Sequence, residues 1–169
     1  MAGKKAVARK TGPLAHVSES GAARMVDVSD KPSTRRVALA EAWVDVGAEV
    51  ALRIAEKGGL AKGGVLETAR IAGIMAAKKT AELIPMCHPL AMDAIDVTAE
   101  LVGARVRLLA EVTSEGRTGV EMEAMTAVSV AALTVYDMVK SAARGIEIGP
   151  VRLLEKSGGK SGAWKKGRG

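Results

Sequence analysis

The sequence of 169 residues contains no phenylalanine, and its aromatic residues are Trp43, Tyr136 and Trp164. Proteins that read single-stranded RNA commonly stack bases on aromatic side chains of a sheet, so this scarcity argues against a nucleic-acid partner. No apolar run approaches the ~20 residues of a membrane-spanning helix, and the N-terminus lacks the apolar segment of a signal peptide. We therefore expect neither nucleic-acid binding nor membrane association.

Cys87 is the single cysteine, so no disulfide can form within the chain. A reducing, cytoplasmic location is the natural expectation for such a chain. Zinc sites usually need three or four Cys, His or carboxylate ligands, and the histidines are only His16 and His88. We therefore predict no metal site.

The net charge of +6 is concentrated at the two ends of the chain. Of the 25 basic residues, four lie in residues 1–10 and five in residues 156–169, which leaves 16 against 19 acidic residues between them. Solvated termini explain such basic ends more simply than nucleic-acid binding does. We predict a disordered basic tail over 1–15, a single catalytic domain over 16–162 and a flexible basic tail over 163–169.

The hydrophobic pattern predicts a β-α-β-β-α-β order with an additional short helix in the first crossover. The predicted strands are residues 35–46, 91–101, 104–114 and 146–156, and the predicted helices are residues 47–57, 63–84 and 119–143. This order predicts an α+β, ferredoxin-like fold, which is an antiparallel sheet with helices packed on one face.

The predicted helix over 119–143 carries no charged residue between Ala124 and Tyr136. A helix that is apolar on all sides must be buried on all sides. One sheet cannot cover every face of it, and a chain of this size has little further mass to do so. We therefore expect a second subunit to cover part of this helix.

Cys87 and His88 lie between Pro85 and Pro89 in the stretch "AELIPMCHPLAMDA". A nucleophile and its base must meet through a hydrogen bond, whereas neighbours in an extended turn point apart. Free cysteine is usually buried, so Cys87 is expected to pack. The two prolines stiffen the turn, which suits the presentation of the His88 imidazole to a ligand.

Asp137 and Lys140 are three residues apart and share one face of the predicted helix. They form either an exposed ion pair of small energetic value or a general acid/base pair whose pKa values are tuned by a buried environment. Glu121 and Glu123 lie in the first turns of the same helix. They either complement the helix dipole or accept paired N–H bonds from a guanine-like or pterin-like edge.

Further lysines occur at turns and helix ends, where solvation is the default interpretation. If they converged, they would line a pocket for a polyanion. The stretch "EKSGGKSG" lacks the spacing of a Walker phosphate loop, but a flexible Gly/Ser loop can still close over phosphates. These lysines are Lys62, Lys78, Lys79, Lys140, Lys156 and Lys160.

Long contiguous stretches resemble the cyclic pyranopterin monophosphate synthase family, which is protein C of molybdenum cofactor biosynthesis. They are "RMVDVSDKPSTRR", "TARIAGIMAAKKTAELIPMCHPL", "GVEMEAMTAVSVAALTVYDMVK" and "IGPVRLLEKSGGKSG". The resemblance runs from about His16 to Gly162. It implies a lyase that converts (8S)-3',8-cyclo-7,8-dihydroguanosine 5'-triphosphate, made by an upstream radical cyclase, to cyclic pyranopterin monophosphate with release of diphosphate. It also implies a ferredoxin-like fold and a hexamer built as a trimer of dimers, with active sites at subunit interfaces.

The resemblance also implies the roles of individual residues. The catalytic residues expected from it are Asp137, Lys62 and Lys140. The expected substrate contacts are Met86, Cys87, His88, Glu121, Met122, Glu123, Lys78, Lys156 and Arg36. No cofactor is expected to be required, although Mg²⁺ can accompany the triphosphate. The chain departs from the family pattern at Lys79, where arginine is expected, and at Met86, where leucine is familiar.

Overall fold

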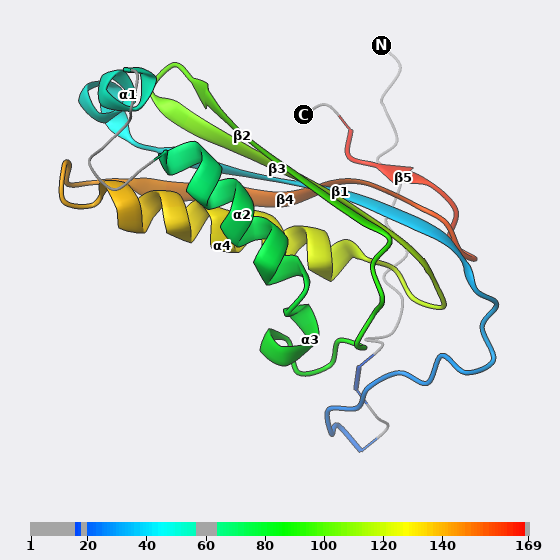
Figure 1. The fold of residues 1–169 in the computed structure, drawn as a ribbon. Helices are drawn as coiled ribbons and strands as arrows, with labels where there is room; N and C mark the ends of the chain where they lie inside the picture. The colour runs from blue at the N-terminus through cyan, green and yellow to red at the C-terminus, as the bar shows by residue number, and fades with distance from the viewer. Residues whose placement is uncertain (1–15, 18–19, 57–63, 168–169) are drawn as a thin grey trace, which may run out of the picture.

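The computed structural model describes residues 16–17, 20–56 and 64–167, which form one antiparallel sheet with helices on one of its faces (Figure 1). The strands follow the spatial order β2-β3-β1-β4-β5. The strands are β1 (Thr34–Asp45), β2 (Ala94–Val102), β3 (Arg105–Gly116), β4 (Glu147–Ser157) and β5 (Trp164–Lys165), and the helices are α1 (Gly47–Ala55), α2 (Val65–Ala77), α3 (Thr80–Leu83) and α4 (Glu121–Val139). The predicted α+β class and ferredoxin-like order are confirmed.

The short strand β5 lies in the segment that the sequence assigned to the C-terminal tail. Trp164 pairs with Lys156 and Lys165 pairs with Glu155, so β5 extends the sheet beyond β4. The Lys165 amine also forms an ion pair with the Glu155 carboxylate.

The face of β1 that packs against the helices consists of small side chains. Ala38, Ala40, Ala42 and Val44 are all fully buried, and they alternate with larger residues that point to the opposite face, as the period of a strand requires. Because alanine is short, α4 can lie close to the centre of the sheet. The sequence pattern of β1 alone does not reveal that its smaller residues form the core.

The opposite face of the sheet holds the buried carboxylate of Glu41. Arg107 Nε donates to Glu41 Oε1 at 2.8 Å, and Arg152 donates to Oε2 from Nε at 2.9 Å and from Nη2 at 2.7 Å. Burial raises the pKa of Glu41, but the hydrogen bonds from Arg152 and Arg107 outweigh it and the pKa is lowered. The Arg105 guanidinium lies 4.5 Å from the Trp43 ring centroid, a cation–π distance. These contacts join β1 to both of its neighbours.

Helices α2 and α4 pack closely through small residues. A Cβ added at Gly73 would lie 3.1 Å from the Ala127 carbonyl oxygen and 3.4 Å from Ala131 Cβ. Gly73 belongs to the second half of α2 and Ala127 to the first half of α4, so the end of α2 lies beside the start of α4 (Figure 1). This antiparallel pairing brings the segment after α2 to the N-terminal end of α4.

Helix α4 is long and apolar enough to cross a bilayer by length and composition alone. Half of that apolar window is nevertheless buried against the rest of the chain, as in a core helix. Leu133 remains 58% exposed and Tyr136 39% exposed on its outer face. The cover by a second subunit, which the sequence predicted, remains a prediction.

The single helix predicted over 63–84 is wrong, because the structure divides it into α2 and α3. The Thr80 hydroxyl donates to the Ala77 carbonyl at 3.0 Å and lies 3.5 Å from the Ala76 carbonyl. A threonine hydroxyl that bonds nearby carbonyls competes with the helical ladder. Lys79 has φ −110° and ψ 11°, outside the helical region. The break redirects the chain toward the turn that holds His88.

Candidate active site

The turn after α3, the first turn of α4 and strand β4 meet around a cavity of about 500 Å³. The turn is closed by the Cys87 amide, which donates to the Ile84 carbonyl at 3.0 Å. Seven residues predicted as substrate contacts line this cavity, which we call the recognition cavity: Met86, Cys87, His88, Glu121, Met122, Glu123 and Lys156. His16 and Lys31 reach it from the N-terminal segment.

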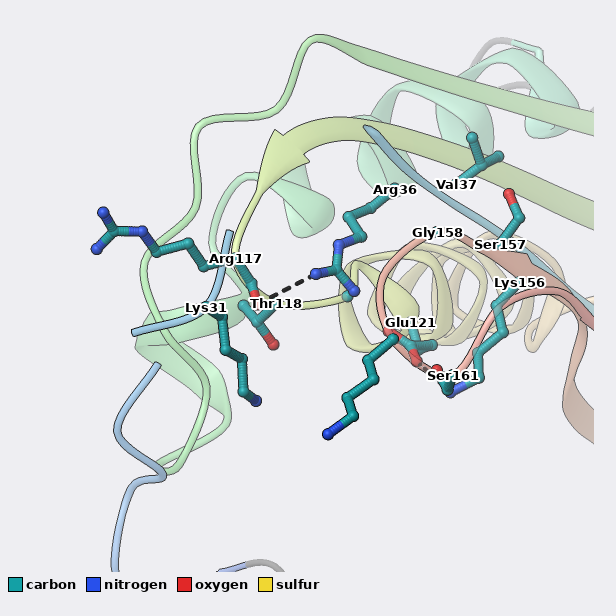
Figure 2. Close-up of a pocket in the computed structure, with 12 residues that line it drawn as sticks. Lys31, Arg36, Val37, Arg117, Thr118, Glu121, Lys156, Ser157, Gly158 and Ser161 are labelled. Carbon is teal, nitrogen blue, oxygen red and sulfur yellow. Dashed lines mark hydrogen bonds and ion pairs between the residues drawn. The ribbon is translucent and has the colours of Figure 1, made fainter. Parts of the chain in front are cut away.

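A second cavity of about 320 Å³ adjoins the first and shares part of its lining. Glu121 is the one acidic residue that lines it, and the basic residues are Lys31, Arg36, Arg117, Lys156 and Lys160 (Figure 2). We call this second cavity the cationic compartment. Five cations around one carboxylate create a positive potential that attracts a polyanion.

Arg36 is held in the cationic compartment by backbone groups. Its Nε donates to the Gly116 carbonyl and its Nη2 to the Arg117 carbonyl, both at 3.3 Å. The loop of "EKSGGKSG" packs directly against it, with φ +97° at Gly158 and +69° at Gly159. A Cβ at Gly158 would lie 2.1 Å from the Arg35 carbonyl oxygen, and a Cβ at Gly159 would lie 1.8 Å from the flexible end of Arg36, at Nη1. Glycine is therefore favoured by backbone conformation at both positions and required by space at Gly158.

Glu121 and Lys156 form an ion pair where the two cavities meet, with Lys156 Nζ 2.8 Å from Glu121 Oε1. Their side chains are 30% and 33% exposed. The Glu121 side chain folds back over Gly119, where a Cβ would lie 1.8 Å from Glu121 Oε2. The pair thus separates a mainly cationic region from a region with a buried acid.

That buried acid is Glu123, which is 3% exposed and whose Oε2 has no hydrogen-bond partner in the described part of the chain. Burial raises the pKa of Glu123, the negative charge of Glu121 raises it further, and its own backbone N–H opposes the change. A buried acceptor with no partner costs free energy, so this oxygen is suited to a ligand that brings donors.

Cys87 behaves as a packed thiol in this cavity. Burial raises the pKa of its thiol. A thiol with a raised pKa is a poor nucleophile, because the thiolate is the reactive form. Within residues 16–17, 20–56 and 64–167, no three His, Cys, Asp or Glu side chains are grouped to hold a metal ion.

Asp137 and Lys140 lie at the opposite end of α4 from the recognition cavity. Lys140 Nζ is 2.6 Å from Asp137 Oδ1, and the hydrogen bond and charge of Asp137 raise the pKa of Lys140. The side chains are 57% exposed for Lys140 and 67% exposed for Asp137 in the single chain. The buried environment expected for this pair is therefore absent from the single chain. At 1.5 Å per helical residue, Glu123 and Asp137 are about 21 Å apart.

The two remaining predicted residues are Lys78 and Lys62. Lys78 follows the last residue of α2 and is exposed, and it lines neither the recognition cavity nor the cationic compartment. Lys62 lies outside the residues that the structure describes.

Sequence reasoning assigned no ligand-binding role to three basic or imidazole side chains that line the cavities. Lys31 lies in "RMVDVSDKPSTRR", which carries the family resemblance, and Arg117 follows β3 without any motif. His16 was considered only as a metal ligand, yet it lines the recognition cavity together with His88. For Lys31, the signal that the sequence carried was the family resemblance of its stretch.

Comparisons with known proteins place this architecture in one family. The family model described as "MoaC family" matches residues 25–159. The chain is 56% identical over 154 residues to "Cyclic pyranopterin monophosphate synthase 1" of Mycobacterium tuberculosis and of Mycobacterium bovis, with 90% of each chain covered. It is also 56% identical over 153 residues to "Cyclic pyranopterin monophosphate synthase" of a Methylobacterium species, covering 89% of this chain and 95% of that protein. The chain therefore belongs to the MoaC family.

Proposed function

We propose that this protein is a cyclic pyranopterin monophosphate synthase of molybdenum cofactor biosynthesis. It converts (8S)-3',8-cyclo-7,8-dihydroguanosine 5'-triphosphate to cyclic pyranopterin monophosphate and releases diphosphate. The names of its relatives at 56% identity support this activity. The enzyme is a lyase, and its substrate is supplied by a radical cyclase that acts on a guanine nucleotide.

The observation that carries the proposal is the polarity of the two joined cavities. The substrate has a guanine-derived edge rich in N–H donors at one end and a triphosphate at the other. The recognition cavity offers the buried carboxyl of Glu123, and the cationic compartment offers five basic side chains. Acidic and cationic regions side by side match the two ends of this one molecule.

Loss of diphosphate is the step that the cationic compartment serves. A hydroxyl of the substrate forms a bond to the α-phosphorus, the bond from that phosphorus to the bridging oxygen of the diphosphate breaks, and the hydroxyl proton passes to a base. Such phosphoryl transfer depends mainly on positioning and on stabilising the charge of the leaving group. Arg36 and Lys156 provide that charge as a planar fork and a point charge respectively.

The ring rearrangement needs proton transfers, which we assign to Asp137 and Lys140. In one chain this pair lies about 21 Å along α4 from Glu123, too far to act on a substrate held in the recognition cavity. We therefore assign the pair to the site of a neighbouring copy, in a hexamer built as a trimer of dimers. The exposed Leu133 and Tyr136 beside Asp137 support burial of this end of α4 in the assembly.

We assign no resident metal to the site, and any Mg²⁺ enters with the triphosphate. The proton transfers and charge stabilisation described above are supplied by side chains. A cytoplasmic location is proposed because a nucleotide-derived substrate is made there.

Turnover of the purified substrate tests the proposed function directly. Wild-type protein should form cyclic pyranopterin monophosphate, detected by mass spectrometry, with one equivalent of diphosphate. Asp137→Asn should lower the turnover number by about 10²–10⁴-fold, the usual contribution of a general acid or base. Asp96→Asn, an exposed carboxylate on β2, serves as the matched control and should retain activity. Absence of product from the wild-type protein would refute the proposed function.

A further inference from the structure

Two carboxylates of the first turns of α4 have opposite surroundings although they are two residues apart. Glu121 is partly exposed and paired with Lys156 at 2.8 Å. Glu123 is 3% exposed, and its Oε2 has no partner in the part of the chain that the structure describes. Lys156, the basic residue of β4 that lines the recognition cavity, is paired with Glu121 and forms no ion pair with Glu123.

The remaining surroundings of Glu123 do not form an ion pair with it either. The cavity wall contributes the Cys87 thiol and the apolar side chains of Met86, Leu90 and Met122. No ion pair to Glu123 occurs among the salt bridges of the described residues. The titratable groups that line the same cavity are Glu121 on α4, Cys87 and His88 on the turn, Lys156 on β4, and His16 and Lys31 on the N-terminal segment.

A buried carboxylate without a paired cation is expensive, and such a group becomes neutral instead. Two carboxyl groups close together reinforce this outcome, because both cannot easily be ionised. Environment alone can therefore assign different protonation states to two chemically identical side chains. Burial raises the pKa of Glu123, and Glu121 raises it further, in agreement with the geometry.

We propose that Glu123 is a neutral carboxylic acid in the unliganded protein and releases its proton when a guanine-type edge enters the recognition cavity. This inference rests on the proposed function for the identity of the ligand. The proton balance is simple: the acid O–H proton passes to the buffer, and the carboxylate then accepts hydrogen bonds from the ring N–H and the 2-amino group. A neutral acid can accept only one of these donors well, so the full pair of bonds requires deprotonation.

The protonation state of free Glu123 is tested by thermal unfolding without any ligand. The pKa of Glu123 is raised in the folded protein, so its contribution to stability is present at low pH and decreases as pH rises above the unfolded-state value. Glu123→Gln keeps the shape and remains neutral. At fixed protein concentration, Tm of Glu123→Gln relative to wild type should rise by a few degrees between pH 4.5 and pH 8.

Glu121→Gln is the matched control, because Glu121 is ion-paired and partly exposed. Its Tm relative to wild type should show no such rise with pH, and loss of the pair with Lys156 should make the difference slightly negative at pH 8. If the Tm difference between Glu123→Gln and wild type stays constant from pH 4.5 to pH 8, Glu123 is not a neutral carboxylic acid in the unliganded protein.

Proton release is measured by calorimetry of GTP binding in two buffers of different ionisation enthalpy. GTP carries the ring N–H and the 2-amino group, whereas ITP lacks the 2-amino group. At a pH where the Tm profile shows Glu123 to be protonated in the free protein, wild type should release about one proton more with GTP than Glu123→Gln does. With ITP, the difference between the two proteins should be smaller. The subtraction removes contributions from the histidines and the phosphates, which are common to both proteins.

Equal proton release from wild type and Glu123→Gln, or no GTP binding by wild type, would overturn the coupling. Either result leaves the proposed enzymatic activity to be judged by turnover of the cyclised substrate. Conversely, if the protein shows no turnover but gives the expected Tm profile, the proposed synthase activity is refuted. The inference that Glu123 is a neutral carboxylic acid without ligand is then still supported. The two failures are therefore distinguishable.

Discussion

The two ends of helix α4 differ in how much of a chemical site the single chain builds around them. At the N-terminal end, the turn after α3, strand β4 and the N-terminal segment enclose Glu123 and gather cations beside it. At the C-terminal end, Asp137 and Lys140 form a 2.6 Å ion pair with both side chains more than half exposed. One end is an enclosed cavity with acidic and basic side chains, and the other is an exposed ion pair in the single chain.

This difference indicates which part of the function one chain can perform. An exposed ion pair has little energetic value and is screened by salt, whereas catalytic acids and bases are tuned by burial and neighbouring charges. The described residues enclose a cavity suited to a ligand at one end of α4, and the Asp137–Lys140 pair lies at the other end. The comparison therefore predicts that recognition and proton transfer are contributed by different copies of the chain.

Co-expression of two impaired variants gives the largest effect and can break this comparison. Asp137→Asn lacks the acid/base group, and Lys156→Ala lacks a cation that lines the cavity. If each site combines the cavity of one copy with Asp137 of another, about one quarter of the sites in a random mixture contain both wild-type groups. At limiting substrate, activity should therefore return from at most about a tenth of wild type to about one quarter.

The control for this experiment is each variant expressed alone, which should retain at most about a tenth of wild-type activity at the same limiting substrate concentration. Mixed hexamers that stay as inactive as the separate variants would show that one chain supplies both ends of α4 to its own site.

A medium effect is expected from the cationic compartment. Lys156→Ala should weaken binding of inorganic diphosphate by about 10–100-fold, because hydrogen bonds to charged groups contribute roughly 1.5–3 kcal/mol. Isothermal titration at constant ionic strength measures the dissociation constant. Lys165→Ala is the matched control, since Lys165 on β5 pairs with Glu155 on β4 and lines neither cavity of the site. An equal loss of diphosphate affinity in the two variants would show that the overall positive charge of the protein, and not the cationic compartment, binds diphosphate.

The smallest effect is expected at Cys87. Its raised thiol pKa keeps it protonated, so iodoacetamide should alkylate it more slowly than free cysteine at pH 8. Cys87→Ala should change kcat by less than about tenfold, which is less than 1.4 kcal/mol. Rapid alkylation coupled to complete loss of turnover in Cys87→Ala would instead give the thiol a chemical role.

Much of the fold could be predicted because its strands and helices have distinct periods. The hairpin of β2 and β3 and the long helix α4 appear at nearly the predicted residues. The division between α2 and α3 could not be predicted, because no glycine or proline marks it and the alanines before Thr80 favour a continuous helix. The choice of Ala38, Ala40 and Ala42 as the core face of β1 likewise depends on how closely α4 approaches.

The candidate site was predictable where its residues are adjacent in sequence, as in Met86-Cys87-His88 and in the first turn of α4. It was not predictable where distant segments meet. Arg117 and Lys31 are close to Lys160 only because the sheet pairs β1 with both β3 and β4. The sequence also could not show that Glu121 is ion-paired and partly exposed whereas Glu123 is buried. The two side chains are chemically identical and lie two residues apart on α4, so only their neighbours in space distinguish them.

The sequence by itself determined the order of strands and helices, the resemblance to one enzyme family and the kinds of groups available for chemistry. Only the tertiary structure decided which carboxylate is buried, which cations share a compartment, and that Asp137 lies at the far end of α4 from Glu123. The physical reason is that charge and burial act through space. Folding brings together residues more than 100 positions apart, such as Arg36 and Gly159, and separates Glu123 from Asp137 along one rigid helix.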